Sequence, residues 1–249
     1  MQRRDFIKAG FALGLPTALI SSPNKSSAQS AEDLDYTDYN GGPPPSYQLY
    51  GTNPPLGPEI VQARKILDAA PKTGTLIDIG NYFESLTDRN KDGEYFNAAW
   101  KERWNPIIVE FYNSTSLPKK QIYTQGDTIA WCAAYLNWAL ARLGKRGTNN
   151  AMSGSFRAIN GHGTGLGKET TSPSSGDVIV FKIRNANPDV GHGHVSVYLD
   201  ETSTAYRVIG GNQKAGKRYS SINTTNIPKS NYVLEEVSFR QFSSIPNFP

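Results

Sequence analysis

The only cysteine of the chain, Cys132, stands where a helix is expected to begin. Asp127 or Thr128 can cap a helix that runs to about Leu143, and the unpaired N–H groups of its first turn would stabilise a thiolate. A thiolate attacks carbonyl carbon, so this position suits a nucleophile. The alternative is a buried core cysteine, because free cysteines are among the most buried residues.

A histidine and an asparagine follow Cys132 at positions that fit a base and an orienting group. His194 begins an expected strand over residues 194–199, and alternation places its side chain opposite that of Val195. Such a histidine can lie over the start of a helix on the same sheet, take a thiol proton and return it to a leaving amine. Asn212 ends the next expected strand and can hold the second ring nitrogen; the alternative for Asn212 is an ordinary turn residue.

The elements that must position these groups change character along the chain. Apolar spacing predicts helices over residues 58–70 and 75–86 and a third that carries Phe96 and Trp104. After the helix at Cys132, the sequence predicts an antiparallel meander, which together with the helices indicates an α+β fold. The expected strands cover residues 177–183, 194–199, 205–209 and 232–239.

The first thirty residues have the three zones of an export signal: a basic start, an apolar run from Ala9 to Ile20 and a small polar tail. The pair Arg3-Arg4 resembles a twin-arginine signal, although Gln2 stands where such signals usually have Ser or Thr. The apolar run is too short to cross a bilayer. We therefore expect a mature protein in the periplasm or outside the cell, where a lone thiol is exposed to oxidation and a chemical reason for keeping Cys132 is favoured.

The charge of the chain argues against a nucleic-acid partner. The formal net charge is +4, but the first thirty residues hold four basic residues against one acidic residue, so the remainder carries only +1. A nucleic-acid-binding protein normally keeps a concentrated basic surface. The expected organisation is a signal peptide at 1–30, a Pro- and Gly-rich linker or arm at 31–57, a helical extension at 58–118 and a catalytic domain at 119–249.

Two segments carry patterns of metal ligands. Asp88, Asn90 and Asp92, followed by Gly93, copy the first half of a calcium loop, but Ala99 replaces the bidentate Glu of its twelfth position. The alternative is a solvated turn, and calcium is the less favoured interpretation.

The histidines give the second metal pattern. His192 and His194 are two residues apart and could share a zinc ion. The remaining histidine, His162, has Leu166 four residues on, where wall-lytic zinc peptidases have Asp, so the third zinc ligand is missing from this pattern.

Four short motifs in a fixed order resemble the CHAP family of cysteine amidohydrolases and peptidases. They are WCAAYLNW at 131–138, GDVIVF at 176–181, GHVSV at 193–197 and GNQ at 211–213. The resemblance covers about residues 120–240 and implies a papain-like core, related to the NlpC/P60 group, that cleaves amide bonds of cell-wall peptidoglycan without a required cofactor. One departure is Gly210, where some members have a Glu two residues before the Asn.

Carried onto this sequence, the resemblance implies Cys132 as the nucleophile, His194 as the base and Asn212 as the orienting residue. The backbone N–H of Cys132 would form the oxyanion hole. Trp131, Gln125 and His192 are the residues expected near the substrate. The other interpretations kept open are the zinc peptidase and a non-catalytic module that binds the wall.

Overall fold

The computed structural model describes residues 53–128, 130–214, 220–231 and 233–248, without the side chains of residues 123–125 and 128. The expected signal peptide and most of the expected linker therefore lie outside the described residues. Among the described residues, no helix combines the length and the apolar character needed to cross a membrane.

The helices precede the sheet, as the sequence predicts. They are α1 (Gly57–Ala69), α2 (Leu76–Glu84), α3 (Pro106–Phe111), α4 (Lys119–Gln125) and α5 (Cys132–Arg142). At α2 the side chain of Thr75 accepts from the backbone of Asp78, while the Asp78 carboxylate accepts from the backbone of Thr75, so each satisfies a donor that a helix start leaves unpaired.

The expected helix through Phe96 and Trp104 is wrong. This segment forms turns, because the side chain of Asn105 donates to the backbone oxygens of Phe96 and Ala98, both at 2.8 Å. Asn105 also caps α3, accepting from the backbone of Ile107 at 2.8 Å. One buried amide thus ends the turn segment and begins the next helix.

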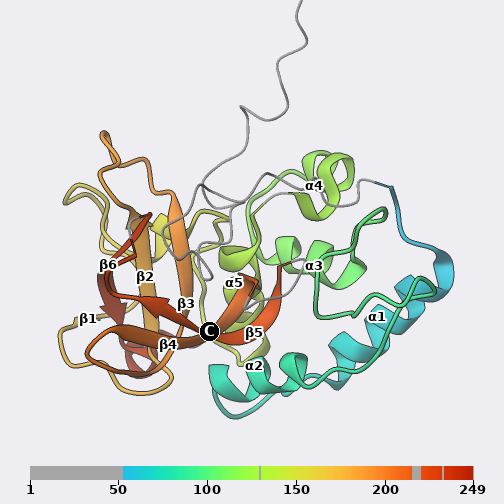
Figure 1. The fold of residues 1–249 in the computed structure, drawn as a ribbon, viewed down its shortest axis with the longest axis horizontal. Coiled ribbons are helices and arrows are strands. Elements are labelled where there is room, and N and C mark those ends of the chain that lie inside the picture. The colour runs from blue at the N-terminus through green and yellow to red at the C-terminus, as the bar shows by residue number, and fades with distance from the viewer. Residues whose placement is uncertain (1–52, 129, 215–219, 232, 249) are drawn as a thin grey trace, which may run out of the picture.

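Six strands form one antiparallel sheet in the order β1-β6-β2-β3-β4-β5 (Figure 1). Together with the helices, this sheet confirms the α+β fold. The strands are β1 (Glu169–Thr170), β2 (Val178–Ile183), β3 (Gly193–Glu201), β4 (Ala205–Gln213), β5 (Ser221–Pro228) and β6 (Leu234–Arg240).

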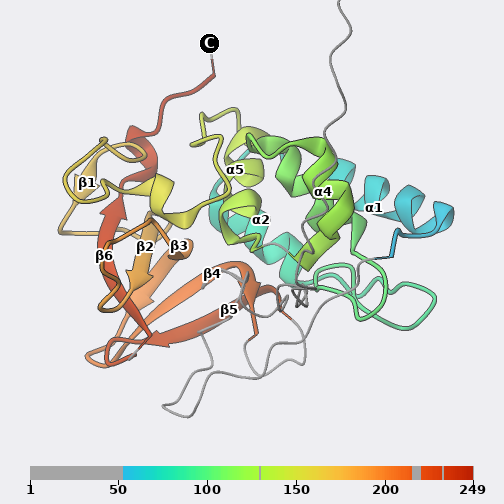
Figure 2. The same ribbon diagram turned by 90° about the horizontal axis from the view of Figure 1, so that it is seen from above.

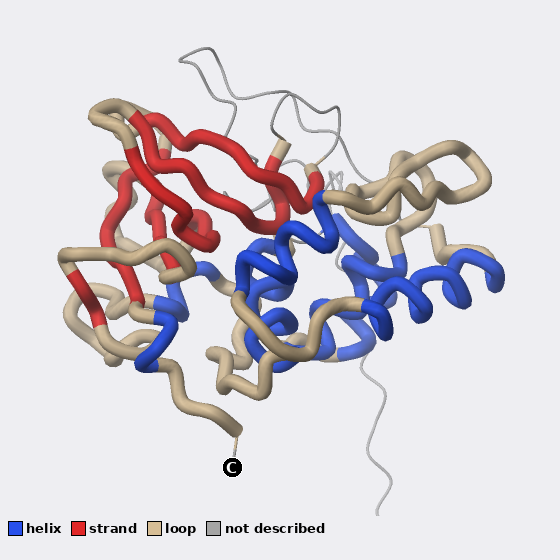
Figure 3. Tube along the Cα trace, turned by 90° about the horizontal axis from the view of Figure 1, so that it is seen from below, coloured by secondary structure: helices blue, strands red, loops and turns tan. Residues whose placement is uncertain are grey.

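The helices cover one face of the sheet, and the other face has a smaller core of its own (Figures 2 and 3). Alternation along β3 divides its side chains between the two: Val195 and Val197 join the helices, and Tyr198 joins the far-side cluster. His194 lies opposite Phe181 of β2, a residue of the far-side cluster. The side chain of His194 therefore projects from the face of the sheet opposite to the one that α5 covers.

The helical segment before residue 119 packs directly on the rest of the chain. Buried residues of α1, α2 and α3 share one hydrophobic cluster with α5 and the sheet. The Glu84 carboxylate accepts from the backbone and hydroxyl of Thr224 in β5, both at 2.7 Å. Arg142 of α5 donates to the backbone oxygens of Asp68 and Ala70 at the end of α1. The core thus crosses the expected boundary at 118/119.

Candidate active site

Cys132 is the first residue of α5 and therefore lies in the first turn of the helix, as the sequence predicts. The residue before it, Trp131, is the N-cap and supplies no side-chain hydrogen bond to the helix. The expected cap at Asp127 is wrong, because its carboxylate accepts from the backbone of Asn105 at 2.8 Å instead. Burial raises the pKa of Asp127 well above its ordinary value, and its second oxygen, Oδ1, is buried with no hydrogen-bond partner.

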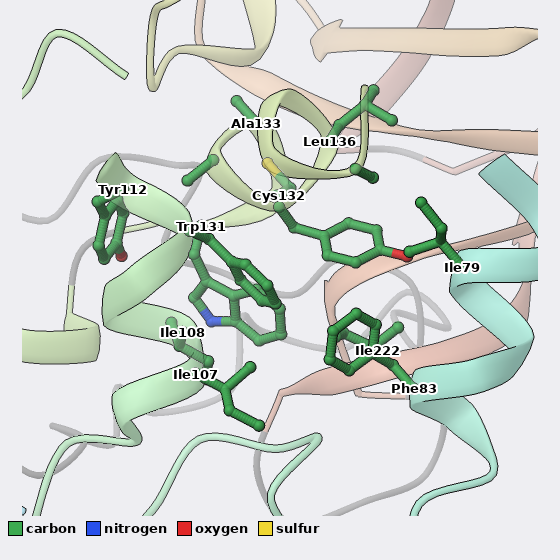
Figure 4. Close-up of a cluster of buried hydrophobic side chains, with 14 of the residues drawn as sticks. Ile79, Phe83, Ile107, Ile108, Tyr112, Trp131, Cys132, Ala133, Leu136 and Ile222 are labelled. Atoms are coloured by element: carbon green, nitrogen blue, oxygen red, sulfur yellow. The ribbon is translucent and has the colours of Figure 1, made fainter. Parts of the chain in front are cut away.

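The side chain of Cys132 is fully enclosed: the residue has 0% relative exposure. Figure 4 shows it at the first turn of α5 beside Ala133, while the indole of Trp131 points toward α3. That indole is buried and stacks on Phe111 with the ring centroids 6.3 Å apart. Trp131, expected near the substrate, is therefore a core residue that fixes the start of α5.

The backbone of β4 at Gly211 lies very close to side chains at the start of α5. A Cβ added at Gly211 would lie 2.6 Å from the Trp131 ring and 2.9 Å from the Cβ of Tyr135. Only glycine permits this distance. Val197 pairs with Ile209, and this register continued by two residues would bring Gly211 across from Val195, next to His194. The first turn of α5 and the histidine are thus at the same end of the sheet.

His194 is the second residue of β3 and only 5% exposed. Its ring centroid lies 6.3 Å from that of Phe181. Burial, the sole cause of the shift, lowers the pKa of His194 to about 4. The ring is therefore neutral near pH 7, which is the form that can accept a proton.

A side-chain contact to the His194 ring comes from Gln213, a residue that was not among the candidates from the sequence. The Nε2 atoms of the two residues are 3.0 Å apart, and Gln213 Nε2 also donates to the hydroxyl of Ser196 at 2.8 Å. Asn212, one residue earlier, stays an untested candidate for an orienting role. Asn212 is buried and has a left-handed backbone at φ 63°.

An irregularity in β4 brings Gln213 to the histidine. Between Gly210 and Gln213 the pairing of β4 with β5 shifts, so the chain carries an extra residue there. In a regular strand residue 213 would share a face with Gly211 and point to the helices; the bulge turns it to the face of His194. Strict alternation gives no signal for this, and no pattern in the sequence marks the bulge apart from its two glycines and Asn212.

The described contacts of the His194 ring are those with Gln213 and Phe181, and neither involves the sulfur of Cys132. The structure places the two residues at one end of the sheet, with Cys132 on the helix face and His194 on the other face. A catalytic pair of Cys132 and His194 across the end of the sheet is therefore a proposal.

The remaining candidates near the site do not converge on a metal. His192 is half-buried, and its Nδ1 atom is buried without a partner. His162 is exposed, and the side chain of Gln125 lies outside the described part of the structure. Within the described residues, no three His, Cys, Asp or Glu side chains are grouped so that they could hold a metal ion. The zinc interpretation therefore gains no third ligand from these residues.

The oxygens of the calcium-like loop are engaged within the protein. Asp88 accepts from the side chain of Gln62 at 2.7 Å, and Asp92 pairs with Arg103 at 2.6 Å. The side-chain oxygen of Asn90 accepts from two backbone N–H groups of the loop, at residues 92 and 94. This arrangement is that of a turn stabilised by an asparagine, and a bound calcium ion stays an untested prediction.

Comparison with known proteins identifies the class of domain. Residues 124–212 match the family model of the CHAP domain, so the resemblance seen in the sequence is confirmed over that segment. CHAP domains are in general peptidoglycan hydrolase domains, typically amidases or peptidases. No curated protein and no solved structure matches the chain.

Proposed function

We propose that this protein is an exported peptidoglycan hydrolase with a papain-like catalytic core, which cleaves an amide bond of the peptide part of the wall through a thioester on Cys132. The observation that carries the proposal is the placement of Cys132 in the first turn of α5 at the same end of the sheet as a buried, neutral His194. Both residues lie within the CHAP match.

In each half of the reaction, one imidazole takes a proton and then returns it. His194 takes the thiol proton of Cys132 as the sulfur attacks the amide carbonyl. The carbon–nitrogen bond then breaks, His194 gives the proton to the leaving amine, and a thioester remains on Cys132. Water attacks the thioester with His194 as the base, and the acid leaves as the thiol regains a proton.

The start of α5 supplies the electrostatic part of this mechanism. The backbone N–H groups of its first turn have no partners within the helix and can donate to the oxygen of the tetrahedral intermediate. The enclosed sulfur adds a requirement: side chains around Cys132 must move before a substrate carbonyl can reach it. The resting structure is then a closed form of the enzyme.

Mass spectrometry of digested peptidoglycan tests the proposal. Purified walls are incubated with the wild type, with Cys132→Ala and with His194→Gln, and new amino and carboxyl termini are identified. We expect new termini from the wild type alone, and their positions show which amide bond is cleaved. Equal products from Cys132→Ala would overturn the nucleophile, and abolition by a chelator without an effect of thiol alkylation would favour the zinc alternative.

Full burial of Cys132 favours a second candidate function, a module that binds the wall without turnover. In that case the cysteine is a core residue and the histidine a structural one. Sedimentation with insoluble peptidoglycan separates the two candidates: the binding module predicts equal retention of the wild type and Cys132→Ala and no released fragments from either. Fragment release by the wild type alone would reject it.

Export through the twin-arginine route is a separate proposal that rests on residues 1–30. Its test is the location and mass of the full chain expressed in a bacterium with that pathway. We expect a shortened protein outside the cytoplasm and retention of the Arg3→Lys, Arg4→Lys double variant inside. Export of the double variant at the wild-type level would overturn this route.

A further inference from the structure

Three polar side chains form a buried group that includes the imidazole of His194. Gln213 Nε2 contacts His194 Nε2 at 3.0 Å and donates to Ser196 Oγ at 2.8 Å. Ser196 in turn donates to the backbone oxygen of Ile209 at 2.9 Å. Gln213 has 0% relative exposure, so its amide is held entirely by the protein.

The amide oxygen of Gln213 is the unexplained atom of this group. Gln213 Oε1 is buried and has no hydrogen-bond partner. An unpaired buried acceptor costs about 1–3 kcal/mol, so one that a native protein retains calls for an explanation. A half-turn about the last side-chain bond exchanges the oxygen and nitrogen of an amide at almost no change in shape.

The two arrangements differ in which ring nitrogen of His194 carries the proton. When the amide nitrogen donates to Nε2, the neutral ring has its hydrogen on Nδ1 and cannot accept a proton there. When Oε1 faces Nε2, the ring carries its hydrogen on Nε2 and leaves the Nδ1 lone pair free. Ser196 can rotate its hydroxyl hydrogen from Ile209 to the same oxygen, so the second arrangement keeps the amide anchored.

Because Gly210 has no side chain, the Gln213 amide can occupy the space beside it. A Cβ at Gly210 would lie 2.3 Å from Ser196 Oγ and 3.1 Å from Gln213 Nε2. A side chain at position 210 therefore cannot reach the ring without displacing both polar groups. The bulge in β4 delivers Gln213 into the volume that residue 210 leaves empty.

We propose that Gln213 is the positioning residue of His194: in the reacting form its Oε1 accepts the Nε2–H of the ring, which leaves the Nδ1 lone pair free to accept a proton. This inference rests on the proposed function for its catalytic consequence. Gln213 acts through His194 and does not touch the substrate. Ser196 holds the amide, and among the described residues no charged side chain contributes to the histidine shift.

NMR on the full chain, with histidine labelled with nitrogen-15, shows which ring nitrogen of His194 carries the hydrogen. The His194 signals are assigned as those missing from the spectrum of His194→Gln. We expect the Nε2–H form in the wild type. Gln213→Glu keeps the shape of the side chain but places a negatively charged carboxylate next to the imidazole, so the pKa of His194 should rise by about one to three units. Gln213→Met keeps the length without a hydrogen bond and should lower kcat on the order of tenfold, with KM within about twofold.

Asn212→Gly is the matched comparison, because glycine accepts the left-handed backbone of that position. The inference would be overturned if Asn212→Gly lost the Nε2–H form while Gln213→Met kept it. It would also be overturned if His194 carried its hydrogen on Nδ1 in every variant. The NMR result needs no substrate. Cleavage by Cys132→Ala would therefore defeat the proposed function and leave the positioning result standing, so that the two failures can be told apart.

Discussion

The buried imidazole of His194 should make the stability of the protein depend on pH in a way that one variant can isolate. Burial lowers the pKa of His194 from 6.5 to about 4. Between these values the unfolded chain binds a proton that the folded protein rejects, so the free energy of unfolding decreases as pH falls. A shift of this size corresponds to about 3 kcal/mol between pH 7 and pH 4, at roughly 1.36 kcal/mol for each pKa unit.

The total pH dependence cannot show this effect, since other groups act in the opposite direction. Burial raises the pKa of Asp127 and of Glu236, and each of these contributes more stability as pH falls. The comparison is therefore between the wild type and His194→Gln, which is neutral at every pH, by urea unfolding followed through tryptophan fluorescence. We expect the wild type to lose about 3 kcal/mol more than the variant from pH 7 to pH 4.

Removal of an exposed histidine, His162→Gln, is the control for the loss of one imidazole. It should leave the difference between pH 7 and pH 4 close to that of the wild type. Identical pH dependence in the wild type and His194→Gln would refute the reasoning, because the ring would then have the same proton affinity in the folded and unfolded chain. It would also remove the argument that His194 is a neutral base.

Three further predictions concern residues that hold the site in place. Gly211→Ala puts a methyl group 2.6 Å from the Trp131 ring and should destabilise the fold by about 1–3 kcal/mol in urea unfolding, whereas a cost below about 0.5 kcal/mol would contradict the close approach. Arg157→Met leaves Asp189, its partner at 2.8 Å, uncompensated and should cost about 3–5 kcal/mol; recovery in the double variant with Asp189→Leu would confirm the cause. The raised pKa of Asp127 makes the wild type less stable as pH rises, and Asp127→Asn removes this dependence. The free energy of unfolding of the variant should therefore rise relative to that of the wild type between about pH 5 and pH 8. The same pH dependence in both proteins would contradict this.

The positions that the sequence predicts correctly are those set by local periodicity. The start of the helix at Cys132 and the alternation of Val195 and Val197 follow from patterns that repeat within one element. The order of four motifs added the CHAP resemblance, which the family match confirms. Each of these signals can be read within a short stretch of chain, so no knowledge of distant contacts is needed.

The features that the sequence does not reveal depend on contacts between distant segments. The edge strand β5 was not predicted, because only Ile222 and Ile227 are apolar in it and its pairing with β4 fixes it as a strand. The contact of Gln213 with the histidine depends on a bulge whose register is set by that same neighbour. The turn segment before α3 forms because Asn105 binds backbone oxygens seven and nine residues away.

The burial of Cys132 also changes the expected ionic form of the resting site. A helix start favours a thiolate by about 0.3–1 kcal/mol, whereas enclosing a charge away from water costs several kcal/mol. Burial lowers the pKa of His194, so its imidazole is also neutral near pH 7. Because the cost of enclosing the charge exceeds the gain from the helix start, we expect Cys132 to rest as a thiol, not as the thiolate that the helix start alone favours.

Iodoacetamide measures this directly, because it alkylates thiolates that it can reach. We expect native Cys132 to react at least on the order of tenfold more slowly than the same chain in urea, with a rate that keeps rising from about pH 5 to pH 8. A plateau already reached at the acidic end of that range would mean a preformed thiolate and would contradict the neutral pair. Fast reaction with a rising profile would instead show that the sulfur is accessible at rest. In the expected case, substrate entry has to open the site before His194 can take the proton, and under the proposed export the enclosure protects the thiol from oxidation until then.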